Sequence, residues 1–207
     1  MSATTPTIRY EVAGPLARIT LANAARHNAM TLQMWQSLPD AIAKAVADNS
    51  VRLIVLSGEG EKAFCAGADI SEFGTARSSS EAVAIYNAAV AHANAALADA
   101  AKPTVALIRG ICFGGGFGLA MSCDLRLATE ESRFRIPAAK VGLGYGYAGV
   151  EALVRRIGMA GVAELLLSAR IFDATDALRY QIIHRLWPRA DFEEKAGAYL
   201  AEMGANA

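Results

Sequence analysis

The stretch PTVALIRGICFGGGFGLAMSCDLRLAT, residues 103–129, decides the fold of this chain. Its apolar run over 103–110 predicts a strand that is buried on both faces, and the run over 124–129 predicts another. Three consecutive glycines, Gly114 to Gly116, stand between these runs and open a short helix. Because glycine is costly to order, the sequence indicates that something approaches this backbone very closely.

Strands and helices alternate along the middle of the chain. A buried strand is expected at 51–58 (VRLIVLSG), a loop at 59–69 (EGEKAFCAGAD) and an alanine-rich helix over 80–101. This order predicts an α/β fold with mostly parallel strands and right-handed crossovers.

The two ends of the chain add further elements. Near the start, two strands are joined by a Gly14-Pro15 turn, and Thr31 is predicted to cap a helix that Pro39 would kink or restart. Four more helices are predicted in the last third of the chain. They span 148–157, 159–168, 174–181 and 190–203.

The composition argues against several classes of protein. The 207 residues include 20 basic and 20 acidic side chains, so a net charge of zero gives no electrostatic case for nucleic-acid binding. No signal-peptide pattern occurs, and no apolar run approaches the ~18 residues that span a bilayer. Cys65, Cys112 and Cys123 lack metal-ligand spacing and predict buried thiols. We therefore expect a cytoplasmic protein without a metal ion or a membrane partner.

The glycine turn fits neither common phosphate motif. In a Gly-x-Gly-x-x-Gly pattern counted from Gly114 or Gly116, the last position holds Leu119 or Met121, and no P-loop lysine follows. Two explanations remain. The turn opens a helix whose N-terminal N–H groups face a ligand, or its glycines permit close packing of that helix on the sheet.

A second loop of small residues, FCAGADI over 64–70, follows the other buried strand. Parallel strands place such loops at the same edge of a sheet, where one N–H from each can point at a single oxygen. The pair predicts an oxyanion hole that is built from main-chain N–H groups.

Three segments carry a family resemblance: LIVLSGEGEKAFCAGADISEF, KPTVALIRGICFGGGFGLAMSCDLRLAT and LVRRIGMAGVAELLLSARIFDATDA. With them the chain resembles the crotonase, or enoyl-CoA hydratase/isomerase, superfamily from about Ile8 to Trp187. The resemblance implies a crotonase-like (ClpP/crotonase) α/β spiral of repeated strand-strand-helix units, with a core domain over 1–187. It also implies that 188–207 starts a C-terminal helical region, which is truncated in this chain.

The resemblance places the chemistry on main-chain atoms. It assigns the oxyanion hole to the backbone N–H groups of Ala68 and Gly115, which would hold the carbonyl of an acyl-CoA thioester. Coenzyme A is then part of the substrate, no cofactor is covalently bound, and homotrimers or dimers of trimers are expected. The resemblance expects a basic side chain near the CoA phosphates. Arg26 is the first candidate for it and His27 the second, unless these are solvated loop residues. The candidates for binding the substrate or its CoA part are Arg26, His27, Ala66, Asp69, Ile70, Gly116 and Tyr147.

The two glutamates that hydratases of this family use are absent. Their positions hold Gly118, two residues after the triple glycine, and Ala138, which follows Pro137. Each general acid or base contributes roughly 10²–10⁴-fold to a rate. The chain is therefore expected to stabilise a thioester enolate but to hydrate an enoyl-CoA poorly, although family usage would name it an enoyl-CoA hydratase.

Two alternatives to hydration stay open. In the family the segment 142–149 borders the acyl pocket, and here it carries Tyr145 and Tyr147. Tyr145 matches a tyrosine of members that resemble methylmalonyl-CoA decarboxylase, although those members have a histidine where this chain has Ala68. The chain would then be a decarboxylase-like lyase that uses Tyr145, or an acyl-CoA-binding protein without catalysis. Either tyrosine can instead be a packing or rim residue.

Four other polar residues are expected to have structural roles. Asp124 is predicted to have a buried hydrogen-bonding role or a capping role, and Asp69 and Glu72 are predicted to cap the first turn of a helix. His92 is predicted to lie in the core or at an interface.

Overall fold

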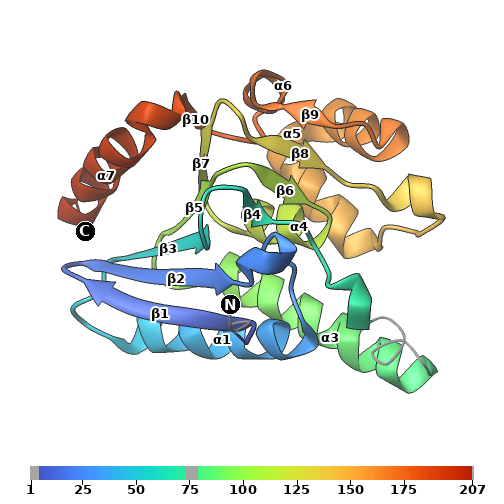
Figure 1. The fold of residues 1–207 in the computed structure, drawn as a ribbon, viewed down its shortest axis with the longest axis horizontal. Helices are drawn as coiled ribbons and strands as arrows, with labels where there is room; N and C mark the ends of the chain where they lie inside the picture. Colours follow the sequence, from blue (N-terminus) through green and yellow to red (C-terminus); the bar gives the residue numbers. More distant parts are fainter. Residues whose placement is uncertain (1–4, 73–78, 207) are drawn as a thin grey trace.

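The chain winds through two sheets in a spiral (Figure 1). The structure, a computed structural model, describes residues 5–72 and 79–206. Successive turns of the spiral add a strand to a six-stranded sheet, a short strand to a four-stranded sheet, and then a helix. This repeat confirms the predicted α/β spiral of strand-strand-helix units.

The larger sheet is parallel except for its first pair of strands. β1 and β2 form an antiparallel hairpin, and every other neighbouring pair is parallel. In spatial order its strands are β1 (Thr7–Ala13), β2 (Leu16–Ala22), β3 (Leu53–Gly58), β5 (Thr104–Ile108), β7 (Leu125–Thr129) and β10 (Arg185–Trp187). The burial of β3 and β5 explains their continuous apolar runs, since both faces of the sheet are covered.

The smaller sheet corrects two expectations. Its strands are β4 (Ala63–Cys65), β6 (Ile111–Phe113), β8 (Arg133–Arg135) and β9 (Phe172–Asp173). β4 lies in a segment that was expected to be a loop throughout. The strand predicted over 103–110 ends instead at Ile108, because Gly110 has a φ of 62° and a Cβ there would lie 2.0 Å from the Lys62 oxygen. The chain therefore passes from one sheet to the other at this glycine.

The helices follow the predicted positions closely. They are α1 (Leu32–Ala47), α3 (Ser80–Ala98), α4 (Gly115–Ser122), α5 (Tyr147–Ser168), α6 (Ala174–Arg179) and α7 (Arg189–Ala205), with 3₁₀ turns η1 (Ala24–Arg26), η2 (Ile70–Glu72) and η3 (Ala138–Val141). The Thr31 hydroxyl caps α1 as predicted, but the restart predicted at Pro39 is wrong, since α1 continues through it. In α5, Gly158 has a non-helical backbone, which confirms the predicted break between two helices.

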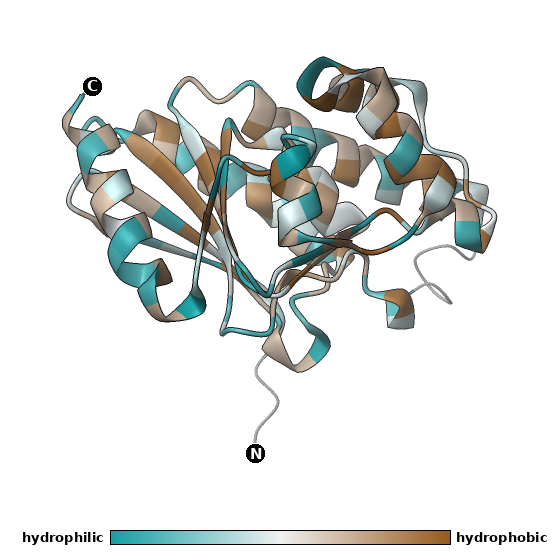
Figure 2. Ribbon diagram, turned by 90° about the horizontal axis from the view of Figure 1, so that it is seen from above, coloured by the Kyte–Doolittle hydropathy of each residue, from teal (hydrophilic) through white to brown (hydrophobic). Residues whose placement is uncertain are grey.

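Helices cover both faces of the larger sheet. α1 and α3 pack in the main core, whereas the opposite face of β3, β5 and β7 lies under Phe192, Ala196 and Leu200 of α7. Figure 2 shows the apolar strands between the flanking helices. Two glutamates of different segments, Glu61 and Glu193, pair with Arg109 just after β5 and tie α7 to this edge of the sheet.

Candidate functional site

The two glycine-rich turns meet at the edge of the smaller sheet. One turn follows β4 and the other follows β6, and these strands are parallel neighbours. A Cβ added to Gly67 would lie 3.3 Å from the Gly115 nitrogen, and one added to Gly115 would lie 3.8 Å from the Ala68 nitrogen. Standard bond lengths then put the Ala68 and Gly115 nitrogens no more than about 6 Å apart. Side chains larger than hydrogen would separate these two backbones.

The Ala68 and Gly115 N–H groups donate to no other residue in the described part of the chain. Two of the flanking N–H groups are engaged. Asp69 N donates to the Met30 oxygen at 2.9 Å, and Gly114 N donates to the Arg135 oxygen at 2.9 Å. The flanking backbone is thus fixed, while Gly115, the first residue of α4, keeps its N–H at the positive end of the helix dipole.

Close packing fixes the position of the Gly115 turn. A Cβ on Gly115 would lie 3.0 Å from the ring of Trp35, which is buried and donates from Nε1 to the Tyr86 hydroxyl at 2.9 Å. Gly116 faces the other way, since a Cβ there would lie 2.4 Å from the Cys65 oxygen. Gly116, one of the predicted substrate-binding residues, is therefore buried between helix and strand, and close packing accounts for it.

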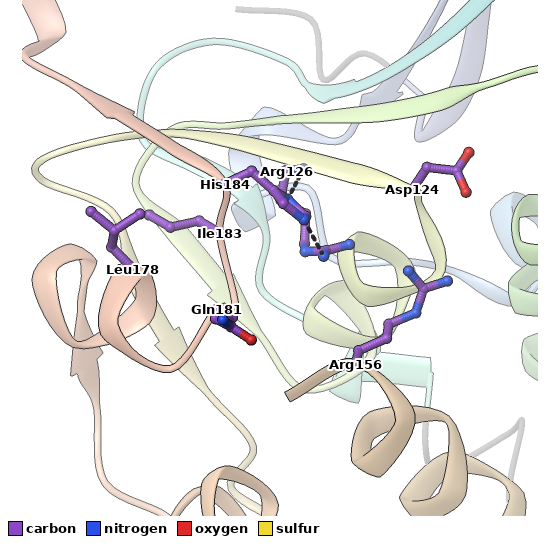
Figure 3. A pocket seen from close by; sticks show the side chains of 7 residues that line it. All are labelled: Asp124, Arg126, Arg156, Leu178, Gln181, Ile183 and His184. Atoms are coloured by element: carbon purple, nitrogen blue, oxygen red, sulfur yellow. Dashed lines mark hydrogen bonds between the residues drawn. The ribbon is translucent and has the colours of Figure 1, made fainter. Parts of the chain in front are cut away.

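The opposite end of α4 is built from charged side chains. The Arg126 guanidinium donates from Nη1 to the Cys123 oxygen at 2.6 Å and from Nε to the Ile182 oxygen at 2.5 Å. Arg156 Nη1 also donates to the Cys123 oxygen, at 3.0 Å. Both arginines lie at this C-terminal end of the helix, where carbonyl groups lack intrahelical partners (Figure 3).

No carboxylate occupies the two positions where the resemblance expects glutamates. A Cβ on Gly118 would lie 3.5 Å from Asn94 Oδ1, an ordinary contact, so this part of α4 faces α3. Asn94 accepts a hydrogen bond from Ser122 Oγ at 2.9 Å and donates to the Val90 oxygen at 2.8 Å. Ala138, the other position, is half-buried at the start of η3.

The Asn94–Ser122 pair was missed by sequence reasoning. Asn94 sits in an alanine-rich helix without any motif around it, and Ser122 looks like an ordinary residue at the end of α4. Only the packing of α3 on α4 brings the two side chains together beside Gly118. No local pattern of the sequence could have identified this pair.

The segments predicted to bind CoA lie next to one another. Ala66 N donates to the His27 oxygen at 2.9 Å, and Arg26 Nη1 lies 3.1 Å from Asp69 Oδ1. Burial acts to raise the pKa of Asp69, but hydrogen bonds from Ser71 and the Arg26 charge lower it below its usual range. The arrangement joins the two stretches that the resemblance selects, with Ile70 exposed beside them.

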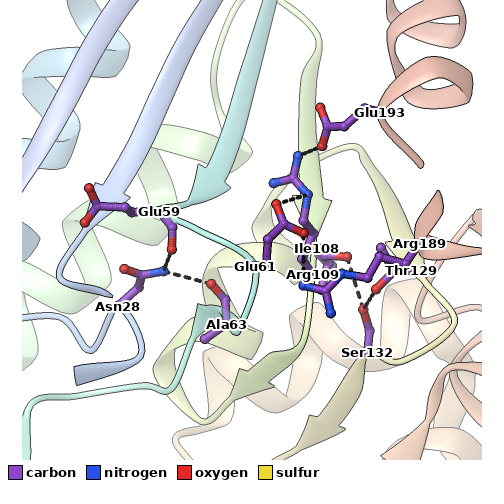
Figure 4. Close-up of polar contacts among 10 residues, drawn as sticks. All are labelled: Asn28, Glu59, Glu61, Ala63, Ile108, Arg109, Thr129, Ser132, Arg189 and Glu193. Atoms are coloured by element: carbon purple, nitrogen blue, oxygen red, sulfur yellow. Dashed lines mark hydrogen bonds and ion pairs between the residues drawn. The ribbon is translucent and has the colours of Figure 1, made fainter. Parts of the chain in front are cut away.

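Asn28 holds the loop before β4, which lies beside the segments predicted to bind CoA. Its Nδ2 donates to the main-chain oxygens of Glu59 at 3.0 Å and Ala63 at 2.8 Å (Figure 4). This loop and His27 line a cavity of about 310 Å³. This cavity therefore lies beside the segments that the resemblance selects for CoA binding.

The two candidate tyrosines lie in different environments. Tyr145 is half-buried, packs against the core and rests on Gly149, where a Cβ would lie 2.8 Å from its ring. Burial raises the pKa of Tyr145, so its hydroxyl stays protonated at neutral pH. Tyr147, at the start of α5, is 83% exposed.

The four polar residues that were assigned structural roles differ in outcome. Asp124 does accept hydrogen bonds, from Thr104 N and Oγ1 at 2.8 Å each, but its side chain is exposed rather than buried. Asp69 caps Ser71 as predicted, and Glu72 accepts from Leu32 N at the start of α1. His92 is exposed on α3, which excludes the core alternative, and its place at an interface stays a prediction.

The cysteines confirm the prediction of buried thiols. All three cysteines are buried and unpaired. Over residues 5–72 and 79–206, no group of three or more His, Cys, Asp or Glu side chains could hold a metal ion. Within the same ranges, no helix has the length and apolarity that a bilayer crossing requires.

Comparison with known families agrees with this geometry. Residues 11–207 match the family model described as enoyl-CoA hydratase/isomerase. The chain belongs to this family. A solved structure of an enoyl-CoA hydratase/carnithine racemase from Magnetospirillum magneticum superimposes with a TM-score of 0.92 at 32% identity, covering 99% of this chain and 75% of that one.

Relatives in the enoyl-CoA hydratase/isomerase family have more than one named activity. The short-chain-enoyl-CoA hydratase of Clostridium acetobutylicum is 29% identical over 198 residues, which cover 95% of this chain and 75% of that protein. A 4-chlorobenzoyl coenzyme A dehalogenase of an Arthrobacter species is 32% identical over 203 residues, covering 96% of this chain and 72% of its own length. Family membership thus leaves the reaction to be argued from the site.

Proposed function

We propose that this family member binds an acyl-CoA thioester and stabilises its enolate with the N–H groups of Ala68 and Gly115. The observation that carries the proposal is that both groups come from turns in backbone contact and donate to no other described residue. An enolate oxygen that accepted from both would also lie at the N-terminus of α4, where a helix favours negative charge.

The missing glutamates decide which use of an enolate is favoured. Hydration needs a group that activates water and another that moves a proton, and neither Gly118 nor Ala138 carries a titratable atom. Loss of carbon dioxide needs no base. The bond between Cα and the leaving carboxylate breaks, its electron pair moves toward the thioester oxygen, and solvent later protonates Cα.

A decarboxylase-like reaction is therefore the second part of the proposal. Tyr145 supports it, because a half-buried phenol that stays protonated can donate a hydrogen bond to the carboxylate before it leaves. Asn94 and Ser122 near Gly118 offer further polar atoms but no charge. A protein that binds acyl-CoA without turnover is the competing possibility.

The CoA moiety would lie along the joined segments. We propose that the adenine and ribose follow Ala66, Asp69 and Ile70. Arg26, whose side chain is 54% exposed, could reach the phosphates. His27, at the cavity beside the loop, is the second basic candidate. We also propose a homotrimer or a dimer of trimers, which would cover exposed apolar side chains such as Ile70, Leu143 and Leu167.

Turnover of three thioesters tests the reaction. Purified protein is incubated separately with crotonyl-CoA, malonyl-CoA and methylmalonyl-CoA, and loss of the enoyl absorbance or release of carbon dioxide is followed. We expect carbon dioxide release from at least one of the last two substrates and hydration of crotonyl-CoA near background.

Matched variants separate the alternatives. Tyr145→Phe removes one hydrogen bond and should lower carbon dioxide release about tenfold, whereas Tyr199→Phe on α7 should not. Rapid crotonyl-CoA hydration would overturn the proposed reaction. Binding of all three thioesters with turnover of none would leave the non-catalytic alternative.

A further inference from the structure

A second cavity lies at the C-terminal end of α4, away from the two open amides (Figure 3). Its volume is about 510 Å³, and β7, α5, α6 and the segment between α6 and β10 contribute to its wall. The polar side chains that line it are Asp124, Arg126, Arg156, Gln181 and His184. The proposed thioester chemistry uses none of these residues.

Positive charge dominates this wall. Arg126 is only 2% exposed and Arg156 is half-buried. Across the described part of the chain, no carboxylate oxygen lies within 4.0 Å of either guanidinium. The acid on the wall, Asp124, accepts from Thr104 N and Oγ1 instead. A buried guanidinium without an adjacent anion is costly, because burial removes the hydration of its charge.

The hydrogen bonds of His184 leave two donors facing each other. Its Nδ1 accepts from the backbone N–H of Arg126 at 3.1 Å, so the neutral ring must carry its proton on Nε2. Arg126 Nη2 lies 3.4 Å from that Nε2 (Figure 3). Both atoms are donors, and an acceptor oxygen to the side of the pair, within hydrogen-bond distance of each nitrogen, would satisfy both.

The charges around His184 keep it neutral. Burial and then the nearby Arg126, Arg185 and Arg156 lower the pKa of His184 to about 4, against which the hydrogen bond from the Arg126 backbone acts only weakly. Arg126 itself spends its Nε and Nη1 donors on carbonyl oxygens, which leaves Nη2 directed at the ring. Arg156 uses only two of its five N–H groups on the end of α4.

We propose that this cavity binds a small oxyanion, a carboxylate or phosphate group, which accepts hydrogen bonds from His184 Nε2 and Arg126 Nη2 and faces Arg156 across the site. Oxyanion oxygens are the acceptors that guanidinium groups bind most strongly. The site lies at the opposite end of α4 from Gly115, so it is separate from the proposed thioester site and independent of it.

Titration followed by NMR tests this site. Sodium phosphate and sodium succinate are added separately at constant ionic strength, and the histidine ring resonances are recorded. The chain has three histidines, and His92, which is exposed on α3 and belongs to neither proposed site, serves as the internal reference. We expect a saturable shift confined to His184 and a rise in the pKa of His184 by one unit or more. Which anion produces the shift identifies the class of ligand.

Two neighbouring arginines on α5 provide a matched comparison. Arg156→Gln should weaken the apparent affinity about tenfold or more, since one charge-assisted hydrogen bond is lost. Arg155→Gln, which removes an exposed cation that pairs with Glu151, should leave the affinity unchanged. The proposal is overturned if neither anion gives a saturable shift of His184, or if the two variants weaken binding equally.

Discussion

The two ends of α4 differ in what surrounds the backbone groups that have no partner within the helix. At the N-terminal end, glycines bring two backbones together and leave the N–H of Gly115 without a partner among the described residues. At the C-terminal end, the side chains of Arg126 and Arg156 saturate the last carbonyls with donors. An eight-residue helix thus ends in exposed backbone dipoles on one side and buried full charges on the other.

The two ends therefore differ in the kind of negatively charged oxygen that each is suited to bind. Fixed dipoles need no reorganisation during the reaction, and they interact more strongly with an oxygen as its negative charge develops. Full charges bind an anion that already exists, and their desolvation must be offset throughout. The N-terminal end therefore suits a transition state, and the C-terminal end suits a permanent ligand or a structural role.

Removing the N–H of Ala68 should have the largest effect. Ala68→Pro deletes that one donor, and no hydrogen bond to another residue in 5–72 or 79–206 depends on it. Loss of one oxyanion-hole donor typically lowers turnover 10²–10³-fold. We expect such a fall in the turnover of the best thioester substrate, with a nearly unchanged melting temperature. The comparison variant Ala66→Pro, which loses the hydrogen bond to the His27 oxygen, should destabilise instead.

A second change guards against distortion by the proline ring. An ester bond in place of the amide at Ala68 removes the N–H but leaves the chain shape intact, and it should give the same loss of turnover. Full activity in the ester variant would show that Ala68 donates nothing to the reaction.

Removing the guanidinium at the other end should instead affect stability. Arg126→Met leaves the Ile182 oxygen without its donor and weakens the capping of Cys123. Unsatisfied buried carbonyls cost about 1–3 kcal/mol each, so we expect a loss of roughly 3 kcal/mol in the free energy of unfolding. Urea denaturation measures it, with Arg155→Met as the exposed control. A neutral result would mean that burying the charge costs as much as its hydrogen bonds contribute.

The sequence predicts the N-terminal end of α4 much better than the C-terminal end. Consecutive glycines and a second loop of small residues predict that another part of the chain or a ligand lies close to this backbone. In the structure the Gly67 and Gly115 turns lie close to each other. The larger-sheet strands and most helices follow from apolar runs and periodicity in the same way. Such features are local, so a short window of residues contains them.

The C-terminal end depends on contacts between distant residues. Arg126 meets His184 across 58 positions, and Arg156 reaches Cys123 from another helix. The pairing of Asn94 with Ser122 has the same origin. Strand β4 was missed for a related reason, because three residues carry too little periodicity to separate a strand from a loop.

Two glycines of α4 separate packing from chemistry. Gly116→Ala would put a Cβ 2.4 Å from the Cys65 oxygen, so we expect a loss of about 2 kcal/mol in the free energy of unfolding. Gly118→Ala meets only Asn94 Oδ1 at 3.5 Å and should gain up to about 1 kcal/mol from its better helix propensity. Denaturant midpoints of the two variants give the test. Equal midpoints would contradict the close approach of α4 to β4.

The pH dependence of stability should show the smallest effect, and it probes the charged end. The pKa of His184 is about 4 in the folded chain, below its ordinary value of 6.5, so the unfolded chain binds more protons between these values. Stability contributed by neutral His184 is present above pH 6.5 and is lost as the pH falls toward 4. Because the ring is partly exposed, we expect only about 1 kcal/mol over this window.

His184→Asn should flatten that slope in urea titrations at several pH values, whereas His92→Asn, at an exposed position on α3, should leave it intact. A slope that survives His184→Asn would mean that the arginine cluster does not act on this ring, and the contrast between the two ends of α4 would then rest on hydrogen bonding alone.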